Sequence, residues 1–115
     1  LQYVDFADDL SKVQNDLGVT IHNFDDLDHF NDLDNVAALC AALDIVVSTR
    51  VTPPFIAAGV GTYTMIANWR QSPWNSILNN PAGPSFQMFD RNTWEPWDNT
   101  ISSISKEILK KTKKN

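Results

Sequence analysis

The chain has 115 residues, 43% of them hydrophobic and 20% charged, a balance that suits a single globular domain with a buried core. Ten of its fourteen acidic residues precede Ile45, opposed there by Lys12 alone, and this acidic field disfavours nucleic acid as a partner of the domain. No apolar run is long enough to form a transmembrane segment, and the single cysteine excludes an internal disulfide.

The N-terminal third predicts a helix, a strand and an acidic loop. Apolar residues at helical spacing from Phe6 to Leu17 indicate a helix that ends at Gly18. Val19–His22 alternates as a strand does, and residues 23–32 follow as an acidic loop. Because the chain starts at Leu1 without a methionine and opens in helix-like sequence, we expect a C-terminal fragment of a longer protein.

The segment from Val36 to Gly61 reads as helix, buried strand and second helix. Apolar residues from Val36 to Leu43 recur at helical spacing, and Cys40 within that stripe is predicted to be a small core residue. The β-branched run Ile45–Val47 is typical of a central parallel strand. Thr52 is predicted to cap the next helix, with Pro53 in its first turn, which would leave a helix N-terminus facing a crevice as an anion site.

The remaining sequence predicts two more strands and a final helix. Thr62–Ala67 reads as a third strand, and Ser85–Phe89 as a short strand inside a stretch rich in tryptophan and proline. A helix from about Trp97 to Lys111 is expected to pack over the sheet, and residues 112–115 form a basic tail. This alternation predicts an α/β, Rossmann-like parallel sheet with flanking helices. Three consecutive strands are few for such a sheet, so a partner half is expected to be missing.

Several segments occur in a characteristic order: AALCAALDIVVS, a polar turn, a helix ending AAGVG, a hydrophobic strand, then SPW, PSFQMF and WEPWDNTI. In this order they resemble the C-terminal half of heptosyltransferase-like glycosyltransferases of GT-B architecture, domains that often follow tetratricopeptide repeats. The similarity covers roughly residues 19–110. The resemblance implies that this half binds the nucleotide-diphosphate sugar, while an N-terminal domain of the same protein supplies much of the acceptor site. It also implies inversion at the sugar carbon without an obligatory metal or other cofactor.

The diphosphate site implied by this resemblance falls on the turn Ser48, Thr49, Arg50, Val51 and Thr52. Such enzymes commonly have V-D-T after the serine and a histidine five positions after the aspartate; here both are absent, and Phe55 stands where the histidine would be. No catalytic residue can therefore be assigned. Arg50 has two interpretations, a bidentate phosphate contact or a surface ion pair with the acidic loop. Ser48 and Thr52 suit local capping as well as phosphate contact.

Other side chains near the predicted crevice also have two interpretations. His22 either contacts a sugar or phosphate or bonds to backbone, and Trp69 and Trp74 either stack on a base or sugar or seal a loop. The D-x-D triplets Asp26–Asp28 and Asp32–Asp34 suit either a Mg²⁺ or Mn²⁺ site or, as we favour, a solvated capping loop without metal.

The sequence therefore leads to a main hypothesis and an alternative. The chain is expected to be the donor-binding half of a glycosyltransferase of the hexosyl or heptosyl type, inactive as a fragment, located in the cytoplasm or at the inner face of a membrane. The alternative is a non-catalytic interaction module derived from such a domain, which would use the tryptophan-rich segment as its surface.

Overall fold

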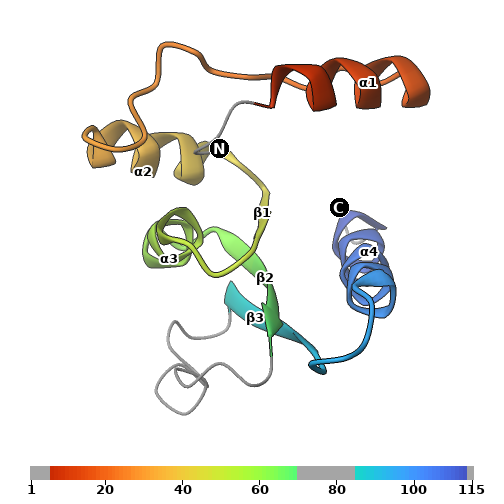
Figure 1. The fold of residues 1–115 in the computed structure, drawn as a ribbon. Coiled ribbons are helices and arrows are strands. Elements are labelled where there is room, and N and C mark those ends of the chain that lie inside the picture. Colours follow the sequence, from red (N-terminus) through yellow and green to blue (C-terminus); the bar gives the residue numbers. More distant parts are fainter. Residues whose placement is uncertain (1–5, 70–84, 114–115) are drawn as a thin grey trace.

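A computed structural model describes residues 6–69 and 85–113 of the chain. These residues form an α/β, Rossmann-like fold, in which a parallel three-stranded sheet lies between helices, as Figure 1 shows. The predicted fold class is therefore confirmed.

The sheet consists of β1 (Ile45–Ser48), β2 (Tyr63–Trp69) and β3 (Phe86–Arg91), in the order β1-β2-β3. Both pairings are parallel, with Val46 opposite Thr64 and Ala67 opposite Phe89. The three strands therefore end at a common edge, which we call the carboxyl edge. Within the described residues β1 is an outer strand, paired with β2 alone.

One face of the sheet is covered by α2 (Leu33–Ala42) and α3 (Thr52–Gly59). Their contact is a small apolar core of Val36, Cys40 and Ala57, against which Val46 of β1 packs. Small side chains such as Ala57 and Cys40 allow the two helices to approach closely. The hydroxyl of Thr62, just before β2, donates to the Cys40 carbonyl oxygen at 2.8 Å and so satisfies one of the unpaired carbonyls at the end of α2.

The opposite face is covered by α4 (Asp98–Lys113), as predicted for the final helix. Thr100 and Ile104 of α4 are buried, and Lys111 Nζ of the same helix lies 4.0 Å from the ring centre of Tyr63. The acidic Asp98 in the first turn and the lysines in the last turn both favour the helix dipole. Because α4 extends to Lys113, residues 112–113 of the predicted basic tail are helical; residues 114–115 lie outside the described part.

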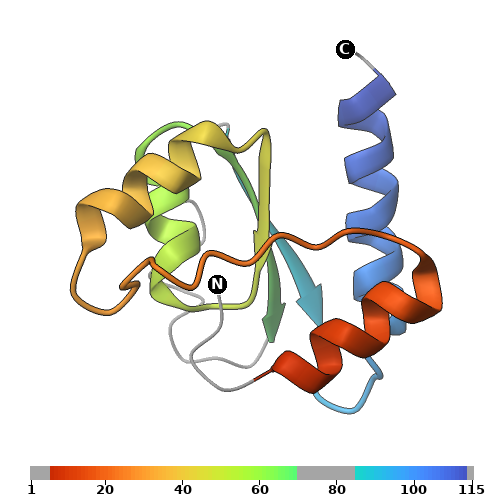
Figure 2. The same cartoon turned by 90° about the horizontal axis from the view of Figure 1, so that it is seen from above.

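The predicted first helix is confirmed as α1 (Ala7–Leu17), and Gly18 ends it with a φ of 63°, the left-handed conformation that glycine adopts readily. No residue of α1 is buried within the described structure, and Leu17 is 68% exposed. Figure 2 shows α1 set apart from the layer of α2 and α3. The apolar residues of α1 do recur at helical spacing, but none of them is buried against the other described residues.

The predicted strand at Val19–His22 is wrong, because this segment has no strand partner in the described structure. The Ile21 N–H donates to the Gln14 side-chain oxygen at 2.8 Å, so a side chain of α1 takes the place of a neighbouring strand. Val19 and Ile21 both remain exposed. Alternation of apolar residues does not produce a strand here, because no layer of the described structure packs against these side chains.

The helix boundaries correct two further details. The N-cap of α3 is Val51 rather than Thr52, and no side chain caps this helix; Thr52 is its first residue. α2 begins at Leu33, before the predicted Val36, because Asp32 accepts a hydrogen bond from the Asn35 N–H and caps it. Pro53 does occupy the first turn of α3 as predicted.

The fully buried Ile66 at the centre of β2 should contribute strongly to stability. Ile66→Ala is expected to lower the free energy of unfolding by about 2–5 kcal/mol, because it leaves a cavity between sheet and helices. The matched control is Ile101→Ala on α4, where the side chain is 56% exposed and the loss should stay below about 1 kcal/mol. Urea denaturation of both variants checks this, and equal losses would contradict the assignment of the core.

Candidate functional site

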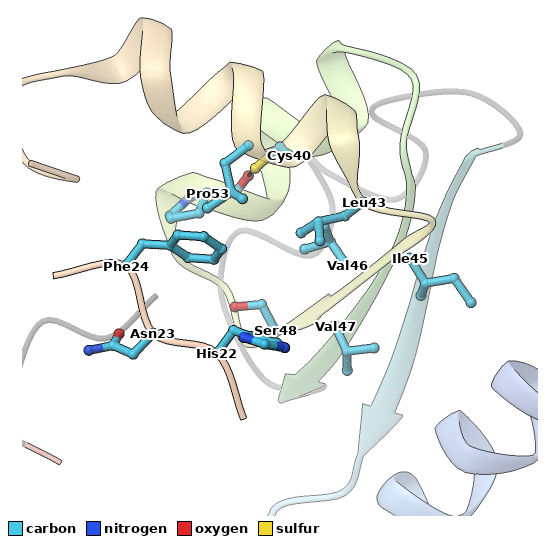
Figure 3. A pocket seen from close by; sticks show the side chains of 11 residues that line it. His22, Asn23, Phe24, Cys40, Leu43, Ile45, Val46, Val47, Ser48 and Pro53 are labelled. Carbon is cyan, nitrogen blue, oxygen red and sulfur yellow. Dashed lines mark hydrogen bonds between the residues drawn. The ribbon is translucent and has the colours of Figure 1, made fainter. Parts of the chain in front are cut away.

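A pocket of about 440 Å³ lies along β1, as Figure 3 shows. We call it the β1 pocket. All four residues of β1 line it, together with the end of α2, the start of α3 and the segment before the acidic loop; its lining residues are His22, Asn23, Phe24, Leu39, Cys40, Leu43, Ile45, Val46, Val47, Ser48 and Pro53. Its size lies within the range of small-molecule sites.

The β1 pocket brings together two of the residues predicted from the sequence. Ser48 is the last residue of β1, and His22 reaches the pocket from the segment after α1. With Asn23 they provide the polar groups in a lining that is otherwise apolar. Few polar groups in an apolar wall suit recognition of a sugar or a base, but none of the described residues that line this pocket is a lysine or arginine that could neutralise a diphosphate.

The rest of the predicted turn points elsewhere. The Val51 N–H donates to the Thr49 carbonyl at 2.9 Å, which tightens the turn. Val51 and Thr52 line a second hollow of about 460 Å³ with residues of the acidic loop and α2. Arg50 Nη1 donates to Asn68 Oδ1 of β2 at 3.4 Å. The predicted residues of this turn therefore do not line one common site. Ser48 lines the β1 pocket, Val51 and Thr52 line the second hollow, and Arg50 contacts β2.

The start of α3 is a weaker anion site than the sequence pattern suggests. Anions bind at helix N-termini through N–H groups that have no partner within the helix. Pro53 and Pro54 occupy the second and third positions of α3, and neither has an N–H. Only Thr52 can offer a donor among the first three residues. Within the Ser48–Thr52 turn, the positive charge for a diphosphate comes from Arg50.

Arg50 contacts the sheet through its hydrogen bond to Asn68. Its partner Asn68 is 1% exposed and also donates, through Nδ2, to Asp90 Oδ1 at 2.6 Å. The sequence analysis did not identify Asn68 or Asp90. Both are polar residues just after predicted apolar strands, and this position could have marked them as candidates. The strand register that places them opposite each other is not visible in the sequence.

The predicted aromatic contacts have separate outcomes. Trp69 is the last residue of β2 rather than part of a loop and is 47% exposed at the carboxyl edge. Trp74 lies outside the described residues. Trp94 is 95% exposed, whereas the ring of Trp97 lies under the Arg91 guanidinium at 4.2 Å. A tryptophan surface in the described part therefore involves Trp94 and Trp69, with Trp97 covered.

The aspartates of the acidic loop act as local hydrogen-bond acceptors. Asp28 Oδ1 accepts from the N–H groups of Phe30 and Asn31, each at 3.1 Å, and Asp32 caps α2. Hydrogen bonds from the Asn31 side chain, and then from these backbone groups, lower the pKa of Asp28. Among residues 6–69 and 85–113 no three His, Cys, Asp or Glu side chains are grouped to hold a metal ion. These contacts support the interpretation as a capping loop.

Cys40 is buried, as predicted, in the wall of the β1 pocket and is 2% exposed. Its Sγ lies 3.9 Å from the Pro53 carbonyl oxygen, and burial raises the pKa of the thiol because it disfavours the thiolate. A raised pKa and a covered sulfur do not suit a nucleophile. Cys40 therefore serves packing between α2 and α3.

Comparison with known proteins gives one informative match. The chain is 31% identical over 107 residues to Protein FlbA of Caulobacter vibrioides; the aligned region takes up 91% of this chain and 18% of FlbA. The chain thus spans less than a fifth of the length of this curated relative. No family model matches the chain. No solved structure matches it either. In the described part of the chain, none of the helices has the length and apolar character needed to cross a membrane.

The position of Cys40 predicts low thiol reactivity. In the native chain the reaction with iodoacetamide at pH 8 should be at least about tenfold slower than in urea-unfolded chain, because the sulfur is covered and its pKa is raised. Mass spectrometry of the alkylated protein measures both rates. Equal rates under the two conditions would show that the β1 pocket wall is open at this point.

Proposed function

We propose that this chain is the nucleotide-sugar-binding half of a glycosyltransferase of GT-B architecture. The proposal is supported by the ordered motifs that resemble heptosyltransferase-like enzymes and by a Rossmann-like sheet compatible with that architecture. The observation that carries it is the position of the Ser48–Thr52 turn, between the carboxyl end of β1 and the start of α3 and beside the β1 pocket. In open α/β sheets, ligands bind in crevices at the carboxyl ends of strands.

The proposal assigns the diphosphate and the rest of the donor to neighbouring parts of the site. Arg50 supplies the fixed positive charge for the diphosphate, with hydroxyls of Ser48 and Thr52 as hydrogen-bond partners. The sugar or the base enters the β1 pocket, where His22 and Ser48 provide polar contacts in an apolar wall. Trp69 at the carboxyl edge offers an aromatic face for stacking.

Catalysis is assigned outside these residues. The aspartate and histidine common in the resembling family are replaced, and Cys40 is buried, so the described residues suit donor binding rather than proton transfer. The acceptor and the groups that activate it would come from an N-terminal domain of a longer protein. The proposed location of the transfer is the cytoplasm or the inner face of a membrane.

A titration of the ¹⁵N-labelled chain with UDP, GDP and ADP tests this proposal. At about 1 mM nucleotide, amide signals of residues 48–52 and 55 should shift in a saturable way, because phosphate binding changes the local field and hydrogen bonding. Amides of the last turn of α4, where Lys111 contacts Tyr63 at the amino end of β2, provide the internal control. A folded chain with no shifts in residues 48–55 for any of the three nucleotides would contradict donor binding.

A second candidate function is a non-catalytic interaction module. The observation that favours it is the character of the β1 pocket, which is mainly apolar and runs along a strand that has a partner on one side only in the described residues. Val47 of this strand is 46% exposed. An outer strand with unpaired backbone groups can accept a further strand from a partner. In a longer protein that partner would be the adjoining half of the sheet.

Hydrogen exchange distinguishes β1 as an outer strand from β1 paired with a further strand. In the 115-residue chain the outward-facing amides of Ile45–Ser48 should exchange quickly, and in a longer protein containing this domain they should exchange at least about tenfold more slowly, because they would be paired. The amides of β2, which is paired on both sides, serve as the reference and should be slow in both proteins. Fast exchange of β1 in the longer protein as well would exclude strand addition at this edge.

A further inference from the structure

The surface of α1 combines an apolar stripe with negative charge. Leu10, Val13 and Leu17 recur at helical spacing along one side of the helix, and none of them is buried in the described structure. Asp9 and Asp16 stand about two turns apart, so both lie along the same edge of that stripe. We call these five residues the α1 face. Apolar side chains left in water favour a partner that covers them.

The helix α4 carries a surface of the opposite charge and the same length. Two serines and a leucine form one exposed side of this helix, and two lysines about two turns apart follow its edge. The Ser105 hydroxyl donates to the Ile101 carbonyl oxygen of its own helix at 2.9 Å, so an apolar side chain can cover it without breaking that bond. We call this surface the α4 face; its members are Ser102, Ser105, Lys106, Leu109 and Lys113.

The two faces match in size when the helices are placed side by side and parallel. With Leu17 opposite Leu109, a heptad register sets Val13 over Ser105. The remaining apolar side chain of the α1 face then falls on the remaining serine of the α4 face. Large side chains over small ones allow two helices to approach closely, as knobs do in holes.

The same register matches the charges. It brings Asp9 to Lys106 and Asp16 to Lys113, the flanking positions through which parallel helices form ion pairs. Within residues 6–69 and 85–113, none of these four side chains is paired with an opposite charge. An antiparallel arrangement would put the aspartates and the lysines on opposite sides of the contact. Charge therefore selects the basic α4 face, in the parallel orientation, as the partner of the acidic α1 face.

Both faces are accessible from one side of the molecule. In Figures 1 and 2 the helices α1 and α4 lie toward one side, and α2 and α3 lie toward the other. A twofold axis on the side of α1 and α4 lets each copy of the chain offer both faces at once. Such an interface is self-complementary and closed, so it stops at two copies.

We propose that the α1 face docks on the α4 face of a second copy of this chain, and reciprocally, to form a twofold dimer. The inference is independent of donor binding, because none of the ten residues lines the β1 pocket or belongs to the Ser48–Thr52 turn. Two helix pairs make a small interface of the kind that gives weak association, so dimers are expected at about 200 µM chain and monomers at about 2 µM.

Sedimentation velocity of the 115-residue chain, with charges reversed on one face at a time, tests this proposal. Asp9→Lys with Asp16→Lys makes both faces basic, and Lys106→Glu with Lys113→Glu makes both acidic. Each double variant alone should remain monomeric at about 200 µM, because like charges now meet. An equimolar mixture of the two should form heterodimers, since every acidic face again has a basic partner.

The matched control is Asp8→Lys with Asn15→Lys, which has the same spacing on the opposite side of α1 and should dimerise as the native chain does. Circular dichroism at about 2 µM verifies that each variant is folded. A native chain that stays monomeric at about 200 µM would overturn the proposal. A dimer that survives either reversal would also overturn it, since its interface would lie elsewhere, and so would a mixture that does not recover.

Cross-linking tests the register without changing any charge. Chains carrying Leu17→Cys and chains carrying Leu109→Cys are mixed at about 200 µM and oxidised, and a disulfide should join one chain of each kind. Asn15→Cys in place of Leu17→Cys is the control and should give at least about tenfold less product, because position 15 lies on the far side of α1. Buried Cys40 should not compete. Equal yields from the two mixtures would contradict the proposed pairing.

Discussion

Parallel pairing of β1, β2 and β3 is the constraint on which the rest of this structure depends. Because the three strands run in the same direction, their carboxyl ends share one edge, and α3 has to begin at that edge to return the chain to β2. The same geometry brings Arg50, Asn68 and Asp90 within hydrogen-bonding reach although they are far apart in sequence. An antiparallel arrangement would place the ends of neighbouring strands on opposite sides and disperse these groups.

Hydrogen-bond donors, positive charge and apolar surface lie at different places along the carboxyl edge, and the functional proposal follows from this distribution. Pro53 and Pro54 remove two N–H groups from the start of α3, so the helix contributes its dipole more than its donors. Positive charge comes from Arg50, which lies toward β2 and β3, while the apolar β1 pocket extends along the other side of β1. A ligand with a charged part and an apolar or weakly polar part matches this division. A nucleotide sugar has that composition, and the apolar side equally suits a neighbouring protein segment.

Much of the fold could be predicted from local patterns. The run Ile45–Val47 and the helical spacing of Val36 to Leu43 specify their elements because periodicity and burial agree. The strand predicted at Val19–His22 has the same kind of alternation but lacks a covering layer, a property of the tertiary structure. Of the candidate site, Ser48 and His22 were identified and do meet at one pocket. Asn68 and Asp90 were missed because their proximity follows from strand register, which the sequence does not display. The loss of a hydrogen-bond donor at Pro54 could have been predicted from the sequence, because proline has no N–H.

The most direct measurement of the central claim is a crystal structure of the chain with a bound nucleoside diphosphate. The account predicts phosphate oxygens within hydrogen-bonding distance of the Arg50 guanidinium at the carboxyl edge, next to the turn that begins at Ser48. Nucleotide bound away from this edge, with Arg50 contacting Asn68 and no phosphate, would contradict it.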